Sequence, residues 1–155
     1  MHIWLLTHPE ELKKRNGTGN LIAENLPNQC TRLVWERTNP PQELISLSKQ
    51  ETLLVYPTTE AEKQTVHGKI ESVAHVIILD GTWQQARKMY NRSPYLHEIQ
   101  KYEIVGQTSI FKRRRNQLEN GLCTAETAVH LLNKFDNSRI GEKLYLAFQS
   151  FNELD

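Results

Sequence analysis

Five short apolar runs lie in the first two thirds of the 155-residue chain, separated by more polar stretches. β-Branched and aromatic residues are frequent in these runs, and their short length suits strands better than helices. The runs are IWLLT (3–7), RLVWER (32–37), TLLVYP (52–57), AHVIILD (74–80) and KYEIVG (101–106). The pattern therefore predicts five β-strands.

Stretches with helical spacing alternate with these runs. The spacing is clearest in WQQARKMYNRS (83–93) and CTAETAVHLLNKF (123–135), and shorter helices or helical turns are predicted within 19–26, 40–49 and 59–71. In the last stretch, one face of a closing helix carries Ile140, Leu144, Ala147, Phe148 and Phe151. Alternating strands and helices predict an α/β fold, a mostly parallel sheet with helices on both faces. We expect one domain over residues 1–155.

The stretch LDGTWQQARKM joins a predicted strand to a predicted helix. Asp80 ends the strand, Gly81 permits a sharp turn, and Thr82 with Gln85 three residues later has the pattern of a capping box. Such a turn requires neither a carboxylate at the strand end nor an indole in the first helical turn. Asp80 and Trp83 are therefore candidate functional residues, with a turn-stabilising aspartate and a core tryptophan as the alternatives.

Two further junctions have a similar composition. In ENGLCTAETAVHLL, Gly121 permits a turn, Thr124 is predicted to cap the helix, and Glu126 lies in the first turn, where the helix dipole favours an acid. In LLVYPTTEAE, a strand ends in Pro57 and Thr58 before an acidic helix start. Because ligands of open parallel sheets bind at the carboxyl ends of strands, three hydroxyl-rich loops there would suit a polar cofactor. Three well-capped helices are the alternative.

The charge of the chain is nearly balanced, at +1, and does not by itself indicate a nucleic-acid partner. Its distribution is uneven, because four cations follow one another without a break: Lys112, Arg113, Arg114 and Arg115. This run is a candidate for RNA phosphate binding, and a solvated loop is the alternative.

The two cysteines give little support for a metal site. Cys30 and Cys123 form neither a CxxC pair nor a Cys/His cluster, which predicts free thiols and no metal. No apolar stretch has the length of a membrane span, and the first residues lack the charge order of a signal peptide. We therefore expect a soluble, cytoplasmic protein without a membrane partner.

The sequence DGTW followed by QQARKM, then SPYL, then GLCTAE, closely resembles the DTW-domain family, which is named for an Asp-x-Thr-Trp signature and has a Ser/Cys-Thr-x-Glu box downstream. HPEELKKRNGTGNLI resembles the His-Pro and Thr-Gly-x-Leu element of that family, and LLVYPTTEA its strand and Pro-Ser/Thr loop. The order and spacing of these fragments make the resemblance specific. It departs at Gly17, where Asn is common, and at Cys123, where Ser is frequent.

The resemblance implies a SPOUT-like fold with a C-terminal trefoil knot and S-adenosylmethionine bound by the knot loops. It implies transfer of the 3-amino-3-carboxypropyl group of that cofactor to N3 of a uridine in tRNA, with release of methylthioadenosine. The signature falls on Asp80, Thr82 and Trp83 and the second box on Thr124 and Glu126, with Arg113 or Arg114 on a basic element upstream. The expected cofactor-binding residues are Pro57, Thr58, Leu79, Asp80, Gly81, Thr82, Trp83, Leu122, Thr124 and Glu126.

This reaction would need a proton acceptor, because uridine N3 is protonated at neutral pH. Asp80 is the candidate catalytic residue, as that base, as a group that stabilises the sulfonium, or as a ligand of the amino group of the cofactor. N3 lies on the Watson–Crick edge, so the uridine must be unpaired. Trp83 is the first candidate to receive its base, with Tyr90 or Phe111 behind it.

Two other classes of protein fit the same residues. A SPOUT-type RNA methyltransferase would use the same pocket but transfer the methyl group. A non-catalytic RNA-binding module would need the basic run but not the aspartate at the strand end. The choice of tRNA and uridine, the oligomeric state and a helper protein for RNA binding are left open by the sequence.

Overall fold

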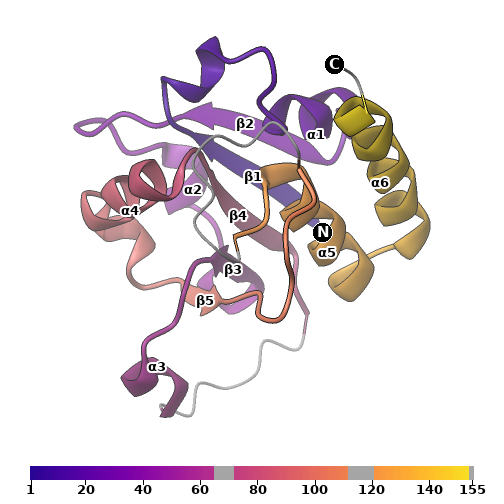
Figure 1. Cartoon of the computed structure of the whole chain (residues 1–155). Coiled ribbons are helices and arrows are strands. Elements are labelled where there is room, and N and C mark those ends of the chain that lie inside the picture. The colour runs from indigo at the N-terminus through magenta and orange to yellow at the C-terminus, as the bar shows by residue number, and fades with distance from the viewer. Residues whose placement is uncertain (65–71, 112–120, 154–155) are drawn as a thin grey trace.

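The computed structural model describes residues 1–64, 72–111 and 121–153 (Figure 1). Within them, five strands form one sheet of order β2-β1-β4-β3-β5, and all neighbouring strands are parallel. The strands are β1 (His2–Thr7), β2 (Cys30–Val34), β3 (Thr52–Val55), β4 (His75–Asp80) and β5 (Gln100–Tyr102). The predicted parallel sheet is confirmed. β2 begins two residues before its predicted run and ends before Trp35, which is buried.

The helices of the described chain lie between these strands and after the last one. They are α1 (Gly19–Asn25), α2 (Gln42–Ile45), α3 (Glu60–Gln64), α4 (Trp83–Asn91), α5 (Thr124–Phe135) and α6 (Ser138–Glu153), with 3-10 turns η1 (Glu11–Lys13), η2 (Lys49–Glu51) and η3 (Pro94–Leu96). Helices were predicted at the places of all six α-helices, but not at η1 or η3. The predicted apolar face of the closing helix is also confirmed, because Leu144 and Phe148 are fully buried.

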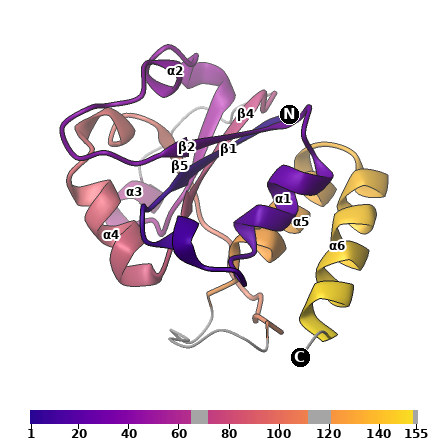
Figure 2. The ribbon, with the colours of Figure 1, turned by 90° about the horizontal axis from the view of Figure 1, so that it is seen from above.

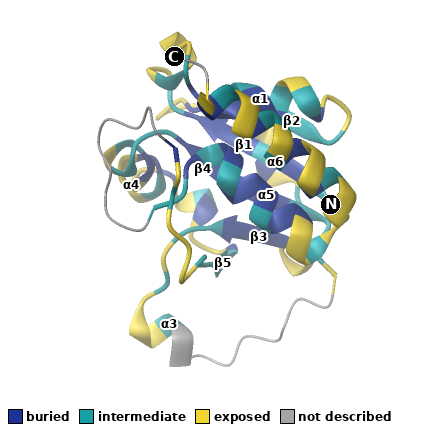
Figure 3. Ribbon diagram, turned by 45° about the vertical axis from the view of Figure 1, so that its right-hand side comes forward, coloured by how far each residue is buried: buried dark blue, intermediate teal, exposed yellow. Residues whose placement is uncertain are grey.

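Helices cover both faces of the sheet. Figure 2 shows α1, α5 and α6 on one side of the strands and α2 and α4 on the other. Alternate residues of β4 point to the two layers: Val76 and Ile78 pack in the core under α1, α5 and α6, whereas Ile77 and Leu79 pack in the core under α4. The three middle strands β1, β4 and β3 therefore form the buried centre of the sheet, whereas the edge strands β2 and β5 are only partly buried (Figure 3).

The two helix starts that the sequence predicts to be alike differ in the structure. At α4, the backbone N–H of Gln85 donates to Thr82 Oγ1 at 3.2 Å and that of Thr82 donates to Gln85 Oε1 at 2.8 Å, so the predicted capping box is confirmed. At α5, the N-cap is Cys123, and the predicted cap Thr124 is wrong by one residue. The hydroxyl of Thr124 instead donates to Asp80 Oδ1 at 2.8 Å.

The trefoil knot implied by the family resemblance remains a prediction. Among the described residues, no helix is both long enough and apolar enough to cross a membrane.

Candidate functional site

A cavity of about 1180 Å³ opens at the carboxyl ends of β3 and β4. Three of its walls come from the loops that the sequence singled out, which lie far apart along the chain. The predicted cofactor-binding residues that line it are Pro57, Leu79, Gly81, Thr82, Trp83, Leu122 and Thr124. Three others, Thr58, Asp80 and Glu126, do not line the cavity; they hold its walls through hydrogen bonds.

Asp80 is fully buried behind the wall of this cavity. Its Oδ2 accepts hydrogen bonds from Arg32 Nη2 at 2.9 Å and from Thr7 Oγ1 at 3.1 Å, and its Oδ1 accepts one from Thr124 Oγ1 at 2.8 Å. The Arg32 guanidinium also donates to Thr7 Oγ1 and to Asn20 Oδ1. Asp80 and Arg32 therefore form a largely buried ion pair that joins the ends of β1 and β4 to the middle of β2 and the start of α5.

The start of α1 approaches this ion pair very closely. A Cβ atom at Gly19 would lie 2.4 Å from Asp80 Oδ2, a distance that only glycine avoids. The preceding residue, Thr18, is buried, and its Oγ1 accepts a hydrogen bond from the backbone N–H of Ala125 at 3.1 Å. The Thr-Gly element thus connects the first turns of α1 and α5 beside Asp80.

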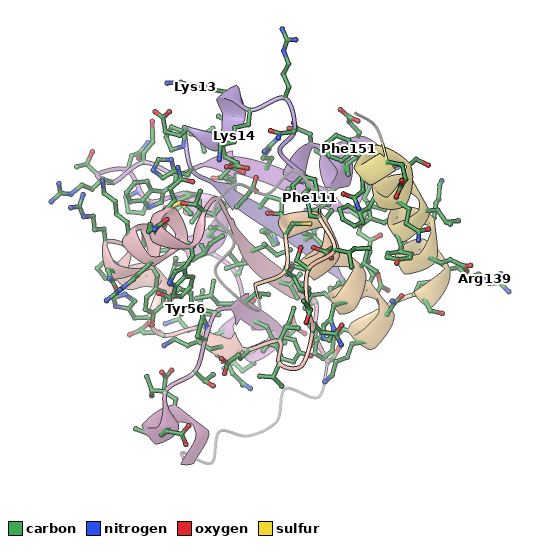
Figure 4. The ribbon with its side chains drawn as sticks, viewed as in Figure 1. Lys13, Lys14, Tyr56, Phe111, Arg139 and Phe151 are labelled. Carbon is green, nitrogen blue, oxygen red and sulfur yellow. The ribbon has the colours of Figure 1, made fainter. Side chains whose placement is uncertain are left out.

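Glu126 anchors a second wall. Its Oε1 accepts hydrogen bonds from the backbone N–H of Cys123 at 3.0 Å and from Ser109 Oγ at 2.5 Å, and its Oε2 accepts one from the backbone N–H of Ile110 at 3.0 Å. The neighbouring Phe111 lines the cavity and is buried against α6. Figure 4 shows Phe111 beside Phe151, and their ring centroids lie 6.1 Å apart.

Thr58 is held by a carboxylate that the sequence pattern did not mark. Glu103 Oε2 accepts from Thr58 Oγ1 at 2.9 Å and from its backbone N–H at 3.3 Å. Glu103 follows β5 and lines the cavity, so its hydrogen bonds connect the Pro-Thr loop to the segment after β5.

The aromatic candidates take different positions. Trp83 is half-buried at the cavity, with its ring centroid 5.6 Å from that of Tyr56, another lining residue. Tyr90 also stacks on Tyr56, at 4.2 Å between centroids. Phe111 belongs to the separate apolar cluster under α6.

The cysteines are free, and burial raises the pKa of the Cys123 thiol to about 12 and that of Cys30 to about 11. No cluster of three or more metal-binding side chains occurs among the described residues. The basic run Lys112, Arg113, Arg114 and Arg115 lies outside the part of the chain that the structure describes.

Sequence reasoning missed several residues that build the site. Arg32 is the first residue of the predicted strand run 32–37, and no local pattern assigns it to Asp80, which is 48 residues away. Thr18 and Gly19 belong to a fragment that carries the family resemblance, but their contacts with α5 and Asp80 arise only in the folded chain. Glu103 likewise acts across 45 residues.

The fold and the site together define an α/β protein with a ligand cavity at the carboxyl edge of a parallel sheet. The DTW domain model matches residues 1–154, and the chain belongs to the DTW-domain family. The expected family is therefore confirmed.

Two curated relatives carry the name tRNA-uridine aminocarboxypropyltransferase 2. The one from Drosophila melanogaster is 29% identical over 143 residues, which cover 84% of this chain and 54% of the relative. The one from Macaca fascicularis is 30% identical over 159 residues, which cover 96% of this chain and 53% of the relative. The chain thus spans about half the length of these relatives, and no solved structure matches it.

Proposed function

We propose that this protein transfers the 3-amino-3-carboxypropyl group of S-adenosylmethionine to N3 of a uridine in tRNA. The observation that carries the proposal is the single cavity formed by the DTW signature, the Pro-Thr loop and the second box. Membership of the family and the names of the two relatives support the same reaction.

The lining of the cavity suits a nucleoside that carries a charged amino-acid tail. Leu79, Leu122 and Val55 offer apolar surface to an adenine ring. Thr82 and Glu103 offer a hydroxyl and a carboxylate for ribose or amino groups. S-adenosylmethionine would supply an electrophilic methylene carbon attached to a sulfonium, which is an excellent leaving group.

The transfer is a nucleophilic substitution. The N3 proton of uridine leaves to a base, a bond forms between N3 and the methylene carbon, and the carbon–sulfur bond breaks with its electron pair passing to sulfur. The protein chiefly has to hold the two reactants in line, because the leaving group needs no further activation. The walls fixed by Asp80, Glu126 and Glu103 serve that orientation.

For Asp80 itself we propose a positioning role. Both of its carboxylate oxygens are occupied by hydrogen bonds and the residue is fully buried, so a substrate proton would have to replace an existing donor. Through Thr124, which lines the cavity, the ion pair with Arg32 fixes the second box against the signature. The role of a general base remains the alternative that the substitution of Asp80 tests.

Two further features belong to this proposal. We propose that the run from Lys112 to Arg115 contacts tRNA phosphates, as a basic run beside the second box would. We also propose that the chain forms the C-terminal trefoil knot that the family resemblance implies, with S-adenosylmethionine bound by the knot loops.

Calorimetry and product analysis test the function. Titration of S-adenosylmethionine into the folded protein with a chelator present should show one binding event without added metal. Incubation with tRNA should then release methylthioadenosine, whereas a methyltransferase would release S-adenosylhomocysteine. A folded protein that binds no S-adenosylmethionine contradicts the proposal.

A further inference from the structure

Four aromatic rings form a continuous file from the cavity to the surface beside α4. Trp83 and Tyr56 line the cavity, with their centroids 5.6 Å apart. Tyr56 stacks on Tyr90 at 4.2 Å, and Tyr90 contacts His97 at 4.5 Å. We call Trp83, Tyr56, Tyr90 and His97 the aromatic file. It connects the interior of the site to solvent.

The packing of α4 on the sheet does not explain why so much aromatic surface on this helix stays accessible. The helix is fixed to the sheet by Ala86 and Met89, which are 8% and 0% exposed. In contrast, Trp83 and Tyr90 on the same helix are only half-buried, and His97 is exposed. Trp83, Tyr56 and Tyr90 thus pack against the core with part of each ring and leave another part accessible.

A fixed cation borders the file. Lys101 Nζ lies 4.8 Å from the ring centroid of Tyr90 and 5.5 Å from that of Tyr56, and Glu62 holds it at 2.9 Å. Burial lowers the pKa of Lys101, but hydrogen bonds to Glu62 and Tyr90 outweigh this effect and raise it overall. The ammonium group therefore stays charged beside the rings.

The segment that contains α4 adds positive charge without any acidic residue of its own. From Gly81 through His97 the chain carries three basic side chains and no Asp or Glu. The three, Arg87, Lys88 and Arg92, are all exposed. Rings and cations therefore occur together on one helix next to the opening of the cavity.

We propose that the aromatic file and the cations of α4 form the surface that binds unpaired nucleotides of the RNA. Surfaces for single-stranded nucleic acid combine cations along the backbone with rings that contact the bases. The target uracil would enter the cavity at Trp83, and the flanking nucleotides would contact Tyr90 and His97. The proposal rests on an RNA substrate, as in the proposed function, and adds the face that receives it and the unpaired state of the segment.

Binding of a fluorescently labelled oligouridylate of about twelve nucleotides, a length within the range that such surfaces occupy, tests the proposal. His97→Ala and Tyr90→Ala should each weaken binding by roughly 5- to 100-fold, the usual effect of losing one stacked ring. Tyr90→Phe should bind like the unchanged protein, because it keeps the ring. An RNA duplex of the same length should bind more weakly than the oligouridylate.

A charge-matched pair of variants tests the cations. Replacing Arg87, Lys88 and Arg92 together with Ala should weaken binding and flatten its dependence on salt. The reason is that fewer phosphate contacts form, so fewer counterions are released on binding. The control replaces Lys134, Arg139 and Lys143, which are exposed on α5 and α6, and should change neither. Figure 4 shows Arg139 on α6, on the far side of the molecule from Tyr56.

Thermal melts show which variants are folded, and the exposed positions His97, Arg87, Lys88 and Arg92 keep the test decisive if Tyr90→Ala unfolds. Unchanged oligouridylate binding by folded His97→Ala and by the α4 triple variant would overturn the proposal, as would an equal loss in the control. Calorimetry with S-adenosylmethionine separates the two proposals. RNA binding that depends on the aromatic file and the α4 cations, without binding of S-adenosylmethionine, would contradict only the proposed function. Normal transfer together with RNA binding that is independent of these residues would contradict only this inference.

Discussion

The starts of α4 and α5 have a similar composition, and the structure uses their residues differently. Both place a glycine before a threonine and a Gln or Glu in the first turn. At α4, the side chains of Thr82 and Gln85 bond to each other's backbone and cap their own helix. At α5, Thr124 donates to Asp80, and Glu126 binds Ser109 and Ile110 as well as Cys123.

The difference shows that one local pattern can serve a local or a tertiary purpose. The α4 start completes its capping box within four residues, so these hydrogen bonds depend on the local sequence and not on another element. The α5 start moves its cap to Cys123, and this shift by one residue frees the Thr124 hydroxyl for the carboxylate of another element. The second box therefore connects segments of the chain through its polar side chains, whereas in the signature the hydrogen bonds to other elements come from Asp80.

The largest effect should follow from Asp80→Asn, which removes the charged carboxylate that binds both Thr124 and Arg32. The change leaves Arg32 without its counter-charge in a buried place, which typically costs about 3–5 kcal/mol of stability. We expect a clearly lower melting temperature, measured by circular dichroism. Single-turnover transfer at saturating S-adenosylmethionine should stay within about tenfold of normal for a positioning role.

Two other outcomes at Asp80 would change its assignment. A rate loss of roughly two to four orders of magnitude with nearly normal cofactor affinity would identify Asp80 as the base. A loss of affinity that excess cofactor restores would identify a binding role. An unchanged melting temperature would contradict the bracing role drawn from the ion pair.

A smaller effect should separate the two helix starts directly. Glu126→Ala removes the acceptor for three donors, so we expect a loss of about 3 kcal/mol and weaker binding of S-adenosylmethionine, because the segment next to Phe111 loses its anchor. The matched variant Gln85→Ala removes one capping acceptor and should cost about 1 kcal/mol without changing cofactor affinity. Urea unfolding and calorimetry measure both quantities. Equal losses in the two variants would contradict the distinction between a tertiary and a local helix start.

The smallest effect should come from pH at the α5 start. Burial raises the pKa of the Cys123 thiol from 9.0 to about 12, so the folded state keeps a proton that the unfolded state loses at lower pH. The resulting stability is fully present below about pH 9 and is lost as pH rises toward about 12. Relative to Cys123→Ala, the protein should lose about 1 kcal/mol between about pH 8 and about pH 10. A constant difference in unfolding free energy between the two proteins would contradict the raised pKa.

The sequence by itself predicted the architecture, because apolar periodicity and capping are local signals. Residues 76–79 form an apolar run of strand length, and burial of both strand faces requires such a run in a parallel sheet. The capping box at Thr82 and the apolar face of α6 are local in the same sense. The fragments DGTW and GLCTAE also indicated membership of the DTW-domain family, which the match over residues 1–154 confirms.

Only the tertiary structure decided what these residues contact. Asp80 looked available at a strand end, but the folded chain buries it against Arg32 and beside Gly19, from two other elements. The aromatic file from Trp83 to His97 likewise depends on Tyr56, at another strand end, which contacts both Trp83 and Tyr90 of α4. Such contacts join residues tens of positions apart, and their geometry follows from the order and register of the strands, which the local pattern does not contain.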